Sequence, residues 1–312
     1  MKFSIYQESR KGGRKYNQDR MGYVFSRDAL MMVVADGMGG HLHGEIAAQL
    51  TVEFMGQKFQ REAKPKLADP VNFLGEAIAG AHNAILRYAD AHALLETPRT
   101  TVVAVLVQDG WTWWAHVGDS RIYLIRAGQV ASQTRDHSRV QQLVLQGLVR
   151  EEAVANHPDR NKIFNCLGAH VPPQVEITPK QRLQERDSML LCTDGLWGPL
   201  PVRMIPASFN GEPLNRAVPA LMTQAERRAG ADCDNVTVIA MTWNELGTAP
   251  DDSISTLLMP AGEFSSQIEG FEAAAEKDTL TDDEIEQAIA EIRDALAKTN
   301  KPDKPDKPDT QK

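Results

Sequence analysis

The strongest constraint on the fold is an Asp109-Gly110 pair that separates two β-rich runs. Residues 100–107 and 111–117 are rich in Val, Thr and Trp, and Asp-Gly is a preferred two-residue turn of a tight hairpin. Two antiparallel strands are therefore expected here.

Other apolar runs of strand length alternate in mixed order with stretches in which apolar residues recur at helical spacing. They predict strands at 31–35, 122–125, 189–193 and 236–242, and helices at 44–63, 73–95, 138–149 and 215–229.

Size and composition favour a soluble globular protein. The chain has 312 residues, of which 42% are apolar and 24% are charged, as is ordinary for soluble domains. No apolar run approaches the ~20 residues that a membrane helix needs, and the N-terminal apolar patch is too short for a signal peptide. The three cysteines form no Cys-x-x-Cys pair, so neither a disulfide framework nor a zinc knuckle is indicated. We expect a cytoplasmic protein without a membrane span.

The net charge of −8 is concentrated at the C-terminal end of the chain. Residues 246–312 contain 16 acidic and 7 basic residues, so the rest of the chain is close to neutral. The basic surface that marks a nucleic-acid-binding protein is missing. We therefore expect no nucleic-acid partner.

Three further segments are expected after a main folded body at residues 1–245. Residues 246–280 are poor in β-branched and aromatic residues and are interpreted as a linker. Residues 281–299 predict an acidic amphipathic helix, with a capping box at Thr281 and Glu284 and a single apolar stripe. This helix could dock on the body, pair with a second chain or hold a partner. Lys-Pro-Asp then repeats three times, and because regular proline prevents helix and sheet, residues 300–312 are expected to be a disordered tail.

Five aspartates lie beside the ends of predicted strands or turns. They are Asp19, Asp36, Asp119, Asp194 and Asp234. Carboxylates at strand ends can converge on one rim of a sheet and hold hard cations there, because Mg²⁺ and Mn²⁺ prefer oxygen ligands. A single Asp-Gly pair is more often an ordinary turn, as is expected for Asp109-Gly110. Five such sites in a fixed order, each with specific neighbours, are hard to obtain from turns alone.

The ordered motifs around these aspartates resemble the bacterial branch of the metal-dependent protein phosphatase family (PPM, or protein phosphatase type 2C-like). The resemblance covers about residues 1–243. Its motifs are Arg14…Asn17-Gln-Asp19, Asp36-Gly-Met-Gly-Gly-His41…Gly44-Glu45, Thr100-Thr101, Gly118-Asp-Ser-Arg121, Thr134-Arg-Asp-His-Ser138, Thr193-Asp-Gly-Leu196 and Asp234-Asn-Val-Thr237. The resemblance implies an α+β fold, with a central β-sandwich of two antiparallel sheets flanked by helix pairs in four layers (αββα). The short C-terminal helical extension is outside the match.

The resemblance also implies a metal centre with two Mn²⁺ or Mg²⁺ ions and a weaker third. Asp36 would bridge the two ions, and the carbonyl of Gly37 would bind one of them. The other implied ligands are aspartates, namely Asp194 and Asp234 for the second ion with support from Asp19, and Asp119 together with Asp194 for the third.

The implied activity is that of a protein serine/threonine phosphatase, which hydrolyses phosphoserine and phosphothreonine. Two cations roughly 3.5–4 Å apart lower the pKa of a bridging water, and the resulting hydroxide can attack phosphorus in line. Asp36 and Arg14 are the expected catalytic residues, and Arg14 matches the arginine that grips the substrate phosphate through a bidentate fork. Without its spacing to Asp19, Arg14 would be interpreted as a solvated surface base.

Two positions depart from the pattern or stay open. Met38 stands where eukaryotic members carry a histidine proposed as general acid, so the proton donor to the leaving oxygen is open, and a water on the metal is preferred. His41 is a candidate substrate-binding residue, although a solvated loop histidine is the favoured interpretation.

The expected partners are phosphorylated proteins and a serine/threonine kinase of the same cell whose action the enzyme reverses. Two other classes of function are alternatives. A silent phosphoprotein-binding module on the same fold would require the loss of a metal ligand, and every expected aspartate is present. The other is a small-molecule phosphatase or pyrophosphatase that uses similar metals on another fold. The ordered set of motifs argues against this class.

Overall fold

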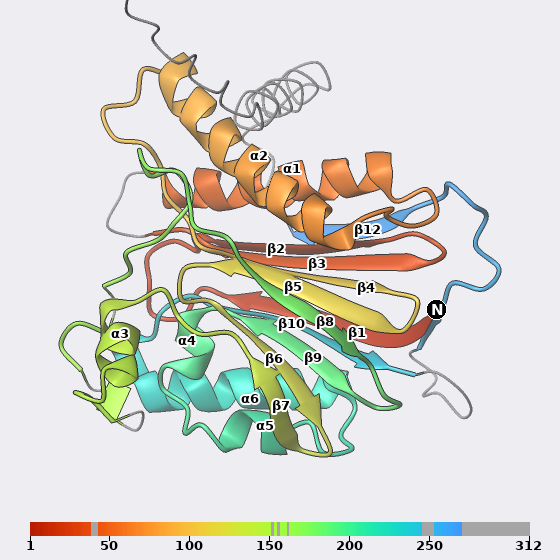
Figure 1. Cartoon of the computed structure of the whole chain (residues 1–312). Coiled ribbons are helices and arrows are strands. Elements are labelled where there is room, and N and C mark those ends of the chain that lie inside the picture. Colours follow the sequence, from red (N-terminus) through yellow and green to blue (C-terminus); the bar gives the residue numbers. More distant parts are fainter. Residues whose placement is uncertain (39–42, 151–152, 155–156, 161, 245–252, 270–312) are drawn as a thin grey trace, which may run out of the picture.

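Two six-stranded antiparallel sheets stack face to face in the computed structural model of the chain (Figure 1). The structure describes residues 1–38, 43–150, 153–154, 157–160, 162–244 and 253–269. The first sheet has the order β11 (Ile254–Ser255), β1 (Lys2–Arg10), β10 (Val236–Trp243), β9 (Ser188–Cys192), β6 (Arg121–Arg126) and β7 (Gln129–Gln133). The second has the order β12 (Ser265–Glu269), β2 (Asp19–Phe25), β3 (Ala29–Asp36), β4 (Val102–Gln108), β5 (Trp111–Val117) and β8 (Glu176–Arg182).

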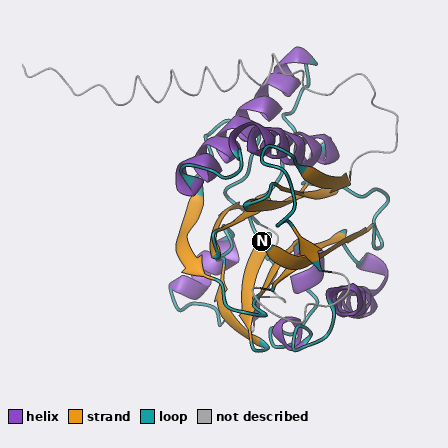
Figure 2. Cartoon of the chain, turned by 90° about the vertical axis from the view of Figure 1, so that its right-hand side faces the viewer, coloured by secondary structure: helices purple, strands orange, loops and turns teal. Residues whose placement is uncertain are grey.

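Helices cover the outer face of each sheet, so the body has four layers (Figure 2). The helices α1 (Gly44–Glu62) and α2 (Pro70–Ala91) pack on the second sheet. The helices α4 (Asp194–Trp197), α5 (Met204–Ala207) and α6 (Leu214–Ala229) pack on the first. The helix α3 (Arg139–Leu145) lies at one end of the sandwich (Figure 1). The predicted α+β sandwich is confirmed.

Three apolar cores hold these four layers together: one under α1 and α2, one between the sheets, and one under α4 to α6. Along β3, Met31 and Val33 contribute to the core under the helices, whereas Met32 and Val34 contribute to the core between the sheets. Successive side chains of a strand point to opposite faces. A strand buried on both faces is therefore apolar at every position, which is why residues 31–35 appear as an unbroken apolar run.

The Asp109-Gly110 hairpin is confirmed. It joins β4 to β5, with Gln108 paired to Trp111, and both turn residues have positive φ angles of 55° and 71°. A two-residue turn with two positive φ angles matches the right-handed twist of the flanking strands. The strands β1, β2, β7 and β8 were not predicted from the sequence.

The predicted linker at residues 246–280 requires a correction. Within it, residues 254–255 form β11, which pairs with β1, and residues 265–269 form β12, which pairs with β2. Both are edge strands, and the side chains of residues 265–268 are exposed, so they have no alternating apolar pattern to reveal them. Phe264 packs against the core under α1 and α2. The predicted helix at 281–299 and tail at 300–312 lie outside the described residues.

Candidate metal centre

Asp19 and Asp36 lie side by side at one end of the second sheet. Asp19 opens β2, Asp36 closes β3, and the two are directly paired in the antiparallel register. Directly paired residues point to the same face of a sheet. Two residues further along their strands, Met21 and Val34 are packed between the sheets. Because side chains alternate along a strand, both carboxylates also face the space between the two sheets.

The backbone at Asp36 is fixed by two threonines and a glycine. Thr100 Oγ1 donates a hydrogen bond of 2.8 Å to the carbonyl of Asp36, and the Asp36 N–H donates one of 3.2 Å to Thr101 Oγ1. A Cβ atom on Gly37 would lie 2.4 Å from the carbonyl oxygen of Gly44. Only glycine at position 37 therefore allows the start of α1 to approach this closely.

Asp194 comes from the first sheet, where it follows β9 and opens α4. The residue before it, Thr193, reaches across to the other sheet: its Oγ1 donates to Asp19 Oδ2 at 3.0 Å. The same Oγ1 accepts a hydrogen bond of 3.1 Å from the N–H of Thr237 in β10. Thr193 therefore ties the ends of β9 and β10 to Asp19, and so brings the carboxylates of the two sheets together.

Asp234 lies just before β10, in a segment that the side chain of Asn235 holds in place. Asn235 Oδ1 accepts a hydrogen bond of 2.9 Å from the N–H of Gln18, and its Nδ2 donates to the carbonyls of Lys11 (2.8 Å) and Tyr16 (2.9 Å). These three bonds anchor the loop between β1 and β2, which carries Arg14. The sequence motif contained Asn235, but no role was predicted for it.

Asp119 completes the group from the end of β5. The preceding Gly118 has a φ of +107°, and a Cβ there would lie 2.6 Å from Thr101 Cβ. The carbonyl of Asp119 accepts a hydrogen bond of 3.1 Å from Trp197 Nε1 in α4. The side chain of Asp119 is buried, with 6% of the residue exposed.

The five carboxylates repel one another. Burial raises the pKa of Asp36 well above its usual value, and the charges of Asp19, Asp194, Asp119 and Asp234 raise it further. Burial also raises the pKa of Asp194 well above its usual value, again with the help of the neighbouring aspartates. Burial raises the pKa of Asp19 to about 6, against hydrogen bonds that lower it, and burial with the charge of Asp136 raises the pKa of Asp119 to about 7. Carboxylates packed in this way are stabilised by cations bound between them.

Arg14 is the cation that the structure places against this group. Its Nη2 donates to Asp234 Oδ2 at 2.6 Å, while 53% of the Arg14 side chain is exposed. The charges of Asp194 and Asp36 also act on Arg14. The structure therefore brings together six of the seven predicted site side chains: Arg14, Asp19, Asp36, Asp119, Asp194 and Asp234. His41 lies outside the described residues.

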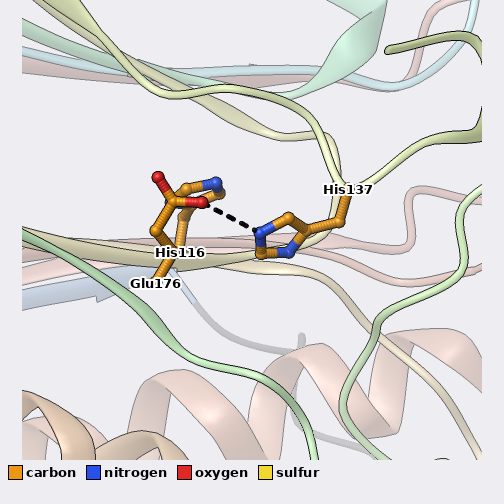
Figure 3. Close-up of side chains that lie close together, drawn as sticks. All are labelled: His116, His137 and Glu176. Carbon is orange, nitrogen blue, oxygen red and sulfur yellow. Dashed lines mark ion pairs between the residues drawn. The ribbon is translucent and has the colours of Figure 1, made fainter. Parts of the chain in front are cut away.

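A second group of side chains that could bind a metal lies beside Gly118, the residue before Asp119 (Figure 3). Ligand atoms of His116, His137 and Glu176 lie within 4.8 Å of one another. His137 Nδ1, however, accepts hydrogen bonds from the N–H of Gly118 (3.2 Å) and from Asn165 Nδ2 (2.8 Å). The neutral ring then carries its proton on Nε2, which faces Glu176 Oε2 at 3.5 Å. The ring of His116 is stacked on that of His137, with centroids 4.5 Å apart. Its Nε2 donates to the carbonyl of Arg135 at 2.7 Å, which leaves the buried Nδ1 of His116 as a lone pair without a hydrogen-bond partner among the described residues.

The comparisons with known proteins agree with the fold. A family model described as protein phosphatase 2C matches residues 7–233. The serine/threonine phosphatase stp of Listeria innocua is 29% identical over 245 residues, which cover 77% of this chain and 95% of that protein.

Solved structures match over a similar span. The S. agalactiae serine/threonine phosphatase superimposes with a TM-score of 0.70 at 29% identity, covering 78% of this chain and all of that one. The catalytic domain of the phosphatase PstP in complex with two manganese ions gives a TM-score of 0.66 at 29% identity, over 78% of this chain and 99% of that one. Since the family model spans most of the described body, this chain belongs to the protein phosphatase 2C family.

Proposed function

We propose that this chain is a metal-dependent protein serine/threonine phosphatase that removes phosphate from phosphoserine and phosphothreonine in other proteins. The observation that carries the proposal is the convergence of five aspartates from both sheets on one end of the sandwich, where burial and mutual repulsion raise the pKa of the central ones. Family membership and the serine/threonine phosphatase names of the relatives support the same activity.

The five aspartates and the carbonyl of Gly37 suit two Mn²⁺ or Mg²⁺ ions and a weaker third. Every donor is an oxygen, which suits hard cations that take octahedral coordination. We assign the first two ions to Asp36, the Gly37 carbonyl, Asp194 and Asp234, with support from Asp19. We assign the third to Asp119 and Asp194. The related PstP domain in complex with two manganese ions supports a site for two ions.

When bound, such ions supply Lewis acidity, which activates water and neutralises charge on the phosphoryl group. The remaining roles belong to side chains of the chain itself. Arg14 has five N–H donors in a planar fork, one of which is directed at Asp234. We propose that Arg14 orients the substrate phosphate and stabilises the charge that develops on its oxygens.

We further propose that the natural substrates are phosphoproteins and that a serine/threonine kinase is the counterpart of this enzyme. The near-neutral charge of residues 1–245 argues against nucleic acid as a substrate. None of the helices in the described ranges is long and apolar enough to cross a membrane. Cys166, Cys192 and Cys233 are buried free thiols, which supports a reducing compartment such as the cytoplasm.

The decisive experiment is hydrolysis of a phosphothreonine peptide with and without added Mn²⁺. The wild-type chain should require the metal, and Asp194→Asn should lose at least ~10²-fold in kcat, because the substitution removes a ligand charge while preserving the shape of the side chain. The matched control is Asp109→Asn, which alters another Asp-Gly aspartate, exposed and paired with Lys66 at 2.7 Å.

Asp109→Asn should keep wild-type turnover. Wild-type protein that hydrolyses no phosphopeptide at any Mn²⁺ or Mg²⁺ concentration would overturn the proposal, and so would equal losses in the two variants. Turnover of nucleotides in preference to phosphopeptides would assign the site to small-molecule substrates instead.

A further inference from the structure

A pocket of about 630 Å³ opens beside the metal centre, between β6, α3 and the turn that joins α4 to α5. Its floor contains the Arg121 guanidinium, which lies 3.5 Å from the centre of the Trp197 ring. Two nitrogens of the same guanidinium donate to the carboxylate of Asp136, at 2.8 and 2.7 Å. Both members of this ion pair are largely buried, so the floor is neutral and fixed.

The remaining charge in the pocket is positive. Apart from Arg121 and Asp136, the charged lining residues are Arg135 and Arg203, and both are exposed. Among the residues that the structure describes, neither side chain takes part in a recorded ion pair or hydrogen bond. The lining also includes apolar side chains, among them Leu200 and Ile205, and the polar side chains of Gln133, Thr134 and Gln141. Two unpaired guanidinium groups in a pocket that also offers apolar side chains suit a ligand side chain with an aliphatic stem and an anionic end.

The pocket shares a wall with the aspartate group. Trp197, which lines the pocket, donates its Nε1–H to the carbonyl of Asp119 at 3.1 Å. It is also the last residue of α4, which begins at Asp194, so one helical turn separates the pocket from a proposed metal ligand. Figure 1 shows α3 and α4 at the same end of the sandwich. A peptide that places its phosphate at the aspartates can therefore place a neighbouring side chain between Arg135 and Arg203.

We propose that this pocket, which we call the arginine pocket, binds an anionic side chain close to the phosphorylated residue and so sets the sequence preference of the enzyme. The proposal rests on the proposed function, because it names the substrate class of the same site. The anion can be the carboxylate of an aspartate or glutamate, or the phosphate of a second phosphorylated residue. Both offer oxygens that guanidinium groups bind in a bidentate manner.

The test compares kcat/KM for three sets of phosphothreonine peptides. One set carries aspartate at each position flanking the phosphothreonine in turn, one carries a second phosphoserine at the same positions, and one carries alanine. The enzymes are the wild-type chain, the Arg135→Glu/Arg203→Glu double variant and Arg216→Glu. Arg216 is an exposed arginine in the first turn of α6, whose other end leads towards Asp234, so it is a control for the change in net charge.

At the best flanking position, the wild-type enzyme should prefer an anionic peptide over the alanine peptide by ~10-fold or more, since charge-assisted hydrogen bonds are being added. The double variant should reduce this ratio to about one or invert it, and Arg216→Glu should leave it unchanged. Whether the aspartate or the phosphoserine series gives the larger ratio identifies the source of the anion. A ratio that is the same in all three enzymes would overturn the proposal, and so would an equal reduction in Arg216→Glu.

A binding measurement distinguishes failure of this proposal from failure of the proposed function. If the wild-type chain hydrolyses none of the peptides, fluorescence anisotropy of the labelled peptides still reports the pocket. Binding of the anionic peptides that is lost in the double variant but kept in Arg216→Glu supports the arginine pocket as an anion site. Equal binding of anionic and alanine peptides by the wild-type chain overturns it.

Discussion

Thr193 Oγ1 donates a hydrogen bond of 3.0 Å to Asp19 Oδ2 and thereby joins the end of one sheet to the end of the other. Asp19 belongs to β2 in one sheet, Thr193 follows β9 in the other, and the N–H of Thr237 also donates to the Thr193 hydroxyl. A donor to an ionised carboxylate stabilises its charged form. The bond therefore opposes the effect of burial, which raises the pKa of Asp19 to about 6, and keeps the carboxylate available as a ligand.

Thr193→Val should weaken Mn²⁺ binding by ~10–100-fold, the range expected when a group that orients a metal ligand is lost. Valine preserves the shape of the side chain and removes the hydroxyl, which is both the donor to Asp19 and the acceptor of the Thr237 N–H. Thr193→Ser is the matched variant, because it keeps the hydroxyl and should restore most of the affinity. The measurement is a Mn²⁺ titration followed by calorimetry or by turnover. Indistinguishable Mn²⁺ affinities for the valine variant and the wild-type chain would show that the hydroxyl has no such role.

The parts of the fold that follow from local pattern were predictable from the sequence. The hairpin at Asp109-Gly110 is determined by its own turn chemistry, and β3 is recognisable because it is apolar on both faces. The edge strand β12 was missed because the exposed side chains of residues 265–268 leave no alternating pattern.

In the candidate site, too, features set by local sequence were predictable, whereas contacts between distant segments were not. The five aspartates were recognisable because each stands in a short motif of its own. Thr193 was not predicted to contact Asp19, since 174 residues separate the two in the chain. Nor was Asn235 predicted to hold the carbonyl of Tyr16, which is 219 residues away. These contacts depend on how the two sheets are placed together, and a single sequence does not encode that placement locally.

Arg14→Ala should lower kcat/KM for phosphopeptides by ~10²–10³-fold, because a charged donor to the reacting phosphoryl group is lost. Arg14→Lys should recover only part of the loss, since an ammonium group keeps the charge but lacks the planar fork. Lys15→Ala is the control: it removes an exposed base next in the sequence and should leave turnover unchanged. If saturating Mn²⁺ restores the activity of Arg14→Ala, the residue acts through the metal ligand Asp234 rather than on the phosphate.

The stability of chelator-treated protein should fall as the pH rises from about 5 to about 7.5. Burial raises the pKa of Asp19 to about 6 and of Asp119 to about 7, whereas an aspartate in an unfolded chain has a pKa of ~3.9. Between these values the folded state binds more protons than the unfolded state, so the free energy of unfolding decreases with pH. Thermal melts in EDTA across this range are the measurement.

Two comparisons make this prediction specific to the aspartate group. Saturating Mn²⁺ should raise the melting temperature most at the higher pH, because the metal binds ionised carboxylates and competes with protons. Asp119→Asn should flatten the dependence in EDTA, since one of the titrating groups is gone. A melting temperature in EDTA that rises between pH 5 and pH 7.5 would contradict the proposed burial of these charges.

Gly195→Ala should damage both stability and activity, because a Cβ at this position would lie 2.0 Å from the carbonyl oxygen of Asn235. That oxygen belongs to the backbone, so the segment carrying Asp234 must move away from α4. Such overpacking costs about 1–3 kcal/mol, or a decrease of roughly 2–12 °C in melting temperature for a domain of this size. Turnover should fall by ~10²-fold, as expected when reacting groups are displaced by about 1 Å.

The matched control is Gly75→Ala within α2, where the new Cβ would meet Ile177 Cδ1 at an ordinary 3.8 Å. This variant should keep its activity and melt slightly higher, because alanine stabilises a helix interior by ~1 kcal/mol relative to glycine. Full activity in Gly195→Ala would mean that the close approach of α4 to Asn235 is not required to place Asp194 and Asp234.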